Sequence, residues 1–204
     1  MTLIDISPVL SSETAVFPGD VSFERQVVMD VEKGDHLTLS SVRSTVHIGA
    51  HVDAPNHYAR GGRAIHEQSL DLYVGAAQVV YAPVRGRRLV PSDVTDGIAA
   101  PRVLFRTDSF PDPNRWNEDF ASLSPELVAW LHDRGVRLVG IDTPSVDPAT
   151  SKALESHIAI AERDMAILEG VVLSHVEPGL YRLIALPLRV KDADASPVRA
   201  VLER

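Results

Sequence analysis

The stretch His47-Ile48-Gly49-Ala50-His51-Val52-Asp53-Ala54-Pro55-Asn56-His57-Tyr58 holds three of the chain's eight histidines and an aspartate within eleven residues. A helix is disfavoured here, because Gly49 and Pro55 both weaken a helix interior. One straight strand would separate His47 from His57 too far for a shared site, since ten residues of strand span about 33 Å. The stretch therefore predicts a strand end or bulged loop that folds at Gly49 and Pro55.

The residue types in this stretch indicate a metal site. His51 and Asp53 lie two positions apart, on one face of a strand, and could share an ion that His47 joins by curling back. Two imidazoles and a carboxylate leave a coordination position open, which is typical of a catalytic ion. The chain contains no Cys, so Zn²⁺ or Mn²⁺ bound through nitrogen and oxygen is expected. The alternative is a histidine-rich surface loop, which the density of ligating residues disfavours.

Composition limits the remaining possibilities. The chain has 204 residues, of which 45% are apolar and 24% charged, and no Gly/Ser linker divides it, so we expect one domain over residues 1–204. The net charge of -8 disfavours binding to nucleic acid. No run of about 18 apolar residues predicts a membrane span, and no basic N-terminal region indicates a secretory signal. We therefore expect a cytoplasmic protein that binds neither nucleic acid nor a membrane.

Short apolar runs predict a sheet. They lie at residues 26–29, 37–42, 77–82, 102–107, 137–142, 171–173 and 181–187. Residues 124–135 predict a helix that begins with Ser124 and Pro125 and ends at a glycine. A second helix is expected from Asp147 to about Leu168, because apolar residues recur there at steps of three and four. Together these elements predict a mixed α/β (α+β) domain with a sheet core.

Other polar residues carry weaker signals. The run Arg85, Arg87 and Arg88 is read as a solvated turn rather than a phosphate site. Asp142 ends an apolar strand, so it either faces a site or caps a turn. The histidines without supporting context, each expected on the surface or half-buried, are His36, His66, His132 and His175.

The pattern HxGxHxDxPxH formed by residues 47–57 resembles the signature of the cyclase-like metal-dependent hydrolases. The chain as a whole is similar to the bacterial kynurenine formamidase branch of that family. The resemblance extends from residues 4–8 to residues 194–202. It includes the segments 17–20, 140–145, 165–170 and 183–188.

The resemblance implies a swivelling β/β/α domain, commonly dimeric or larger, with two zinc ions. His47, His51 and Asp53 would hold the first ion. Asp53 would bridge to the second, which His157 and Glu169 would also hold. In the same way, the resemblance makes His57 the general acid/base. It makes Phe17, where Trp is the expected residue, a contact for the substrate.

The implied activity is hydrolysis of N-formyl-L-kynurenine to L-kynurenine and formate. Two alternatives stay open. One is an amidase or imidase of the same superfamily acting on a cyclic, isatin-like amide, which the Phe at position 17 keeps in view. The other is a non-catalytic metal-binding module. A titratable His57 beside the ligands favours an enzyme, because binding alone does not require it.

Overall fold

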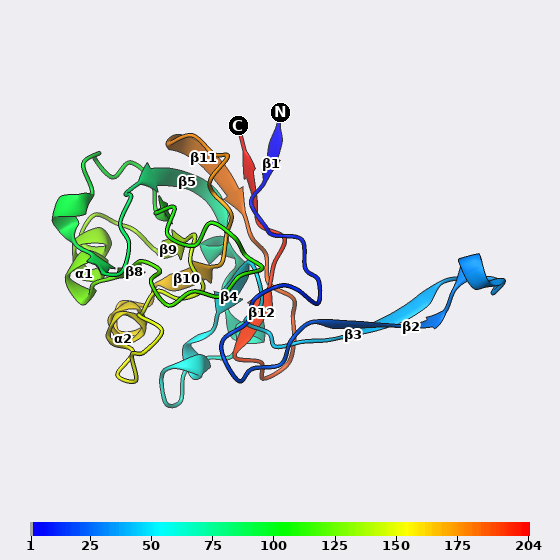
Figure 1. The fold of residues 1–204 in the computed structure, drawn as a ribbon. Helices are drawn as coiled ribbons and strands as arrows, with labels where there is room; N and C mark the ends of the chain where they lie inside the picture. Colours follow the sequence, from blue (N-terminus) through cyan, green and yellow to red (C-terminus); the bar gives the residue numbers. More distant parts are fainter. Residues whose placement is uncertain (1) are drawn as a thin grey trace.

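The computed structural model describes residues 2–204, which build a curled nine-stranded sheet (Figure 1). The strands follow the order β1-β13-β11-β5-β7-β9-β10-β4-β12 across the sheet. Their bounds are β1 Leu3–Asp5, β4 His51–Asp53, β5 Val74–Tyr81, β7 Arg102–Arg106, β9 Leu138–Ile141, β10 Ala166–Glu169, β11 Gly179–Ile184, β12 Ala195–Pro197 and β13 Val201–Glu203. β5, β7, β9 and β10 run parallel, and the flanking pairs are antiparallel. The sheet is therefore mixed, as the sequence predicts.

The remaining elements lie around this sheet. Helices α1 (Pro125–His132) and α2 (Glu155–Ala161) lie side by side near the short pair β6 (Arg88–Leu89) and β8 (Ser122–Leu123). β2 (Glu24–Met29) and β3 (Leu39–Arg43) form a two-stranded ribbon that projects from the body (Figure 1). Within residues 2–204, neither helix has the length and apolar character needed to span a bilayer.

The parallel strands divide their side chains between two cores. In β7, Leu104 belongs to one buried cluster, while Val103 and Phe105 belong to the other. This alternation is expected of a strand buried on both faces. One cluster includes the inner faces of α1 and α2. The other draws residues from both ends of the sheet order, because the sheet curls around it.

Helix α1 forms where the sequence predicts it. The hydroxyl of Ser124 accepts a hydrogen bond from the backbone N–H of Leu127 at 3.1 Å, and Pro125 opens the first turn. Leu127, Val128 and Leu131 are buried on its inner face. The predicted strands at residues 26–29, 37–42, 77–82, 102–107, 137–142 and 181–187 are also confirmed, as β2, β3, β5, β7, β9 and β11.

The predicted second helix from Asp147 to about Leu168 is confirmed only in its middle and is wrong at both ends. α2 covers only Glu155–Ala161, and a turn with Asp164 at a positive φ of 50° follows it. β10 then pairs with β9 on one side and β4 on the other. A short apolar run buried on both faces fits a helix as well as a strand, so periodicity alone misassigns it.

The predicted strand at residues 171–173 is also wrong. The backbone N–H of Val172 donates to the carbonyl of Ile6 at 2.8 Å, but residues 171–173 form no strand. The segment packs as a buried loop, because Val171 and Leu173 belong to the core enclosed by the curled sheet.

Candidate metal centre

The histidine-rich stretch folds as the sequence predicts. The chain bends at Gly49, where φ is 53°, forms β4 over His51–Asp53, and turns again in a short 3₁₀ helix over Pro55–His57. β4 is the buried strand between β10 and β12, and its register sets His51 opposite Glu169. The Nε2 atom of His51 lies 3.1 Å from Oε2 of Glu169.

A close backbone approach fixes this arrangement. Gly170 follows Glu169 with a positive φ of 66°, and a side chain at this position would collide with the carbonyl group of Gly49. Only glycine allows both the dihedral angle and the contact. The end of β10 and the bend before β4 are thereby held together, and Glu169 is held beside His51.

Asp53 lies at the middle of the cluster. Its Oδ1 atom is 3.0 Å from Nδ1 of His47 and 3.5 Å from Nε2 of His51. Its Oδ2 atom is 3.5 Å from Nε2 of His157, which α2 supplies. Glu169 closes the group, with Oε1 3.7 Å from the same Nε2 atom. The structure thus brings together all five residues that the sequence assigns to metal binding.

Unsatisfied buried atoms test whether this cluster suits a metal. Nε2 of His51 and both carboxylate oxygens of Asp53 are buried with no hydrogen-bond partner. Nδ1 of His51 lies 2.9 Å from the carbonyl of Gly49, so its proton can be donated there while Nε2 keeps a free lone pair. Buried polar atoms are costly to leave unpaired, and a divalent cation would satisfy all three. The residues present therefore fit a metal.

Ligand atoms within 4.8 Å of one another fall into two groups that share Asp53. One contains His51, Asp53 and Glu169, and the other contains His47, Asp53 and His57. Nitrogen and carboxylate oxygen suit Zn²⁺ and Mn²⁺. Asp53 belongs to both groups, and its Oδ1 atom faces His47 and His51 while its Oδ2 atom faces His157.

The charges in the cluster compensate one another. Burial alone would lower the pKa of His47, but the neighbouring carboxylate of Asp53 raises that pKa to about 9. The pKa of His157 rises to about 10, because Asp147 and Asp53 outweigh burial. Burial opposes ionisation of Asp53, yet His157 and His47 hold its pKa well below the usual range. Without metal, the histidines therefore carry the positive charge that the carboxylates require.

His57 lies at the exposed edge of the cluster. Its Nδ1 atom is 3.4 Å from Oδ2 of Asp194, and the same oxygen is 3.0 Å from Nε2 of His47. The rings of His57 and His47 are 4.2 Å apart. The sequence predicts no role for Asp194, although this residue begins the segment 194–202 to which the family resemblance extends.

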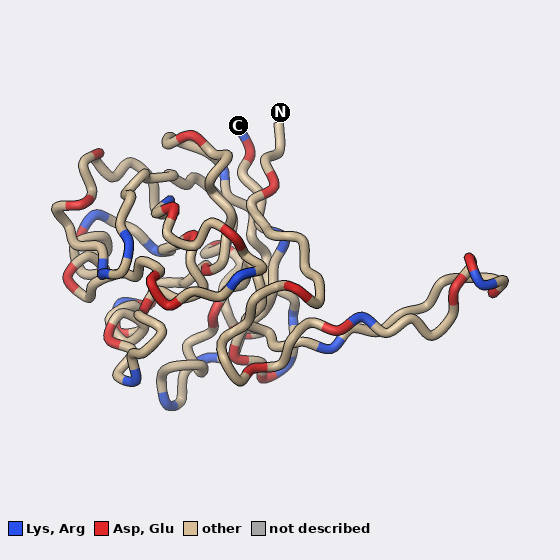
Figure 2. The backbone as a smooth tube through the Cα atoms, in the orientation of Figure 1, with Lys and Arg blue, Asp and Glu red and all other residues tan. Residues whose placement is uncertain are grey.

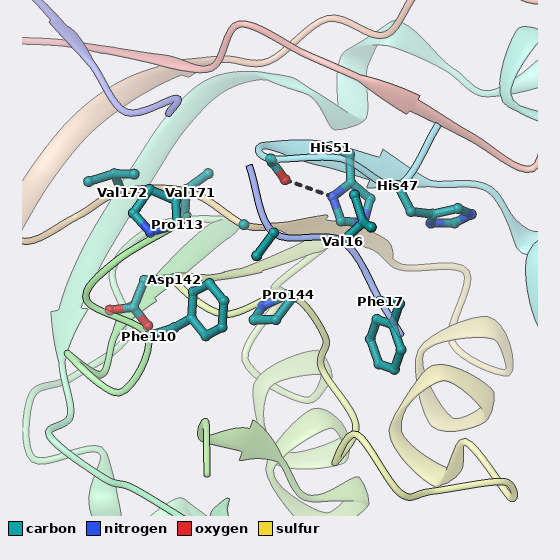
Figure 3. A pocket seen from close by; sticks show the side chains of 13 residues that line it. Val16, Phe17, His47, His51, Phe110, Pro113, Asp142, Pro144, Val171 and Val172 are labelled. Atoms are coloured by element: carbon teal, nitrogen blue, oxygen red, sulfur yellow. Dashed lines mark hydrogen bonds between the residues drawn. The ribbon is translucent and has the colours of Figure 1, made fainter. Parts of the chain in front are cut away.

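A cavity of about 230 Å³ opens over the cluster. Phe17, Asp20 and Pro144 line it together with the metal-site residues. Figure 3 shows the adjoining inner pocket, where Phe17 and His47 lie near Val16 and Pro144, and where His51 makes its contact to Gly49. Phe17 therefore lies at the wall of the cavity above the cluster.

The structure also shows the surroundings of Asp142 and Arg88. Asp142 caps a turn: its carboxylate accepts hydrogen bonds from the backbone N–H groups of Thr107 at 2.8 Å and Asp108 at 2.9 Å. Arg88 corrects the expectation of a solvated turn, because it is half-buried and binds Asp147 at 2.6 Å. Asp147 in turn contacts Nδ1 of His157 at 2.8 Å. Arg88 and Asp147 are 59 residues apart, so the local sequence gives no signal of their pairing.

Known proteins are similar to this chain over nearly its whole length. Residues 4–148 match the family model described as "Putative cyclase". The chain is 45% identical over 202 residues to the kynurenine formamidase of Bordetella avium, covering 98% of this chain and 97% of that protein. It is 43% identical over 203 residues to that of Bordetella petrii, with the same coverage. A solved structure described as "The Structure Of Potential Metal-Dependent Hydrolase With Cyclase Activity" shares the fold, with a TM-score of 0.85 at 24% identity over 98% of this chain and 96% of the other. The chain belongs to the cyclase family and, within it, to the kynurenine formamidases.

Proposed function

We propose that the protein hydrolyses the formamide of N-formyl-L-kynurenine to L-kynurenine and formate, a step of tryptophan degradation by the kynurenine pathway. The observation that carries the proposal is the buried cluster around Asp53 at the base of the cavity, with His57 at its edge. Identity of 43–45% to kynurenine formamidases over nearly the full chain supports the substrate.

Two zinc ions are the proposed cofactors, with Mn²⁺ as the alternative. His47, His51 and Asp53 would hold one ion, and Asp53, His157 and Glu169 the other. When bound, the ions supply Lewis acidity, which lowers the pKa of water to near neutrality and polarises an amide carbonyl. The unsatisfied atoms of His51 and Asp53 support this ligand set.

His57 is the proposed general acid/base. Hydrolysis of a formamide requires a proton on the departing aniline nitrogen, and imidazole gives and takes protons readily near neutral pH. His57 borders the cavity, and its contact to Asp194 orients the ring through Nδ1. Its Nε2 atom is then the one left to exchange a proton with the substrate.

Phe17 is the proposed contact for the aromatic ring of the substrate. Its ring is partly exposed and lines the same cavity as His57. A phenyl face stacks on an aryl ring but donates no hydrogen bond, unlike an indole. Phe17 therefore contributes packing rather than polar recognition.

The direct test is formamidase activity with metal analysis. Metal-free protein prepared by chelation should be inactive on N-formyl-L-kynurenine, and it should recover on addition of Zn²⁺ in proportion to the metal bound. Isatin is assayed in parallel as the cyclic-amide substrate. Faster turnover of isatin would replace the proposed substrate by the cyclic amide. Full activity in fully chelated protein would exclude the metal mechanism, and loaded protein that turns over neither substrate would point to a binding module.

We also propose a homodimer, because the β2–β3 ribbon needs a partner. Val28, Leu39 and Val42 are 62%, 51% and 60% exposed on this ribbon. An isolated two-stranded hairpin is marginal in water. The body of the same chain offers a groove of about 470 Å³ in which Leu186 and Leu188 are exposed. Acidic residues and Lys33 lie at the tip of the ribbon (Figure 2). In the groove, Arg199 is already paired with Asp5 at 2.9 Å, so the exposed apolar residues rather than charge support a second copy of the chain as the partner.

A further inference from the structure

A buried ionic group lies behind His157, at the ring nitrogen that faces away from the metal cluster. Asp147 is 0% exposed, and its Oδ2 atom is 2.8 Å from Nδ1 of His157. The same oxygen accepts the backbone N–H of His157 at 3.0 Å, and both carboxylate oxygens lie 3.1 Å from the backbone nitrogen of Ser156. These contacts fix both the first turn of α2 and the imidazole that this turn carries.

The contact to Asp147 settles which ring nitrogen of His157 faces the metal cluster. A carboxylate only accepts hydrogen bonds, so Nδ1 must be the protonated nitrogen. The Nε2 atom then points toward Asp53 and Glu169, at 3.5 Å and 3.7 Å from their nearest oxygens. Metal-bound histidines are oriented in this way by a carboxylate on the second nitrogen, which also makes the ligand more basic.

Arg88 compensates the negative charge of the buried Asp147 carboxylate. Its Nη1 atom donates to Oδ1 of Asp147 at 2.6 Å, and also contacts the carbonyl of Leu123 at 2.7 Å and the hydroxyl of Ser156 at 2.8 Å. A buried anion is expensive unless a cation pairs with it. Arg88 supplies that cation from β6 and ties β8 and α2 to the same point.

We propose that Asp147, held by Arg88, is a positioning residue that binds Nδ1 of His157 and so presents its Nε2 atom to the metal centre. The proposal rests on the metal centre proposed above. It adds a residue outside the ligand set and assigns a role to Arg88. Neither position is recognisable from the sequence, because Asp147 precedes a proline in what reads as a helix start.

The test is the affinity of the metal-free protein for Zn²⁺, measured by competition with a chromophoric chelator. In Asp147→Asn, one heteroatom of the side chain becomes a donor, so the amide cannot accept from both Arg88 and His157. We expect affinity to fall by about 10- to 100-fold. The matched control is Ser156→Ala, which removes two hydrogen bonds of the same cluster but leaves the Asp147–His157 contact intact. The control should bind Zn²⁺ within two-fold of wild type, even if its melting temperature falls by as much as that of Asp147→Asn. Equal losses of affinity in the two variants would overturn the proposal.

A second measurement needs no variant. In wild-type protein loaded with Zn²⁺, long-range ¹H–¹⁵N NMR of labelled histidine should show His157 protonated at Nδ1 and metal-bound at Nε2. Metal on Nδ1 would overturn the proposal even if Asp147→Asn failed to fold. Neither measurement involves a substrate. A protein that binds Zn²⁺ as expected but leaves N-formyl-L-kynurenine intact would refute the proposed activity and leave this inference standing.

Discussion

Trp116 packs edge-on against Phe17, with ring centroids 4.7 Å apart and planes inclined by 62°. Trp116 also contacts Phe110 and Phe120, with centroids at 6.2 Å and 5.9 Å. The aromatic wall of the cavity is therefore a group of rings anchored in the loop before β8, rather than one free side chain. Sequence reasoning singled out Phe17 and missed the indole behind it.

This packing predicts how Phe17 acts on the substrate. Replacing Phe17 by Ala should raise KM about 2- to 13-fold, since an aromatic pair contributes about 0.5–1.5 kcal/mol, and should leave kcat within two-fold. Steady-state kinetics with N-formyl-L-kynurenine measure both constants. Phe17→Trp keeps an aromatic face and should retain the wild-type KM. A loss confined to kcat would instead place Phe17 in the chemical step.

Replacing His57 should lower activity without lowering the metal content. We expect His57→Ala to lower kcat by about 10²- to 10⁴-fold, because a general acid/base contributes that much, while bound zinc stays at the wild-type level. Elemental analysis of the purified variant measures the metal. His132→Ala, an exposed histidine outside the site, is the control for both readouts. Metal lost in step with activity would make His57 a ligand in the group that it forms with His47 and Asp53.

Metal binding should release protons. The pKa of His47 is raised to about 9 and that of His157 to about 10. Both imidazole rings therefore carry two protons and a positive charge at pH 7.5 in the metal-free protein. Metal ligands must be deprotonated. Burial alone would lower the pKa of His51, but Glu169 and Asp53 raise it as well, so we expect at least two protons per subunit to be released on loading with zinc. Calorimetry in buffers of different ionisation enthalpy counts them. Release of fewer than one proton would show that these two histidines are not both ligands.

Asp142 should destabilise the fold above mildly acidic pH. Burial raises its pKa to about 6, although Thr107 and Asp108 oppose the rise, whereas the unfolded value is 3.8. The folded state therefore holds the proton more tightly, and the resulting stability is present below pH 3.8 and lost as the pH rises through 6. About two pKa units correspond to ~3 kcal/mol.

The measurement is urea denaturation of metal-free protein at pH 4 and pH 7. Asp142→Asn removes this titration, so the stability of the variant relative to wild type should increase by up to ~3 kcal/mol between the two pH values. The histidine cluster is identical in both proteins and cancels in the comparison. A relative stability that does not change with pH would show that Asp142 is ionised throughout.

The β2–β3 ribbon should hold two copies together. Val28→Glu or Val42→Glu places a charge on an exposed apolar position of the ribbon and should convert a dimer into a monomer. Analytical ultracentrifugation gives the mass. Leu70→Glu, at a residue that is 56% exposed on the body, is the matched control and should remain dimeric. A wild-type monomer at micromolar concentration would refute the dimer.

The sequence predicts those parts of the fold whose signals are local. Ser124 and Pro125 mark the start of α1, and Gly49 and Pro55 mark the folds in the histidine loop. The sequence does not predict β10 as a strand, because a short apolar segment buried on both faces lacks the alternating pattern of a strand. Its identity as a strand depends on β9 and β4, which the chain brings beside it from elsewhere.

The residues of the candidate site also divide into those that the local sequence predicts and those that it does not. His47, His51 and Asp53 are recognisable by spacing, since one strand and one bend bring them together. His157 and Glu169 became candidates only through family resemblance. The sequence predicts no role for Asp147 or Asp194. Asp147 reads as the start of a helix, and Asp194 contacts His47 across 147 residues, so neither contact is visible in the local pattern.

The register of β4 on β10 has a consequence for assembly. Side chains alternate faces along a strand, so a slip of one residue would turn His51 and Asp53 away from Glu169 together. Half of the proposed centre would be lost if these two strands paired out of register. A metal that needs ligands from both strands would therefore bind only molecules in which β4 and β10 are correctly paired, and metal content would report on that pairing.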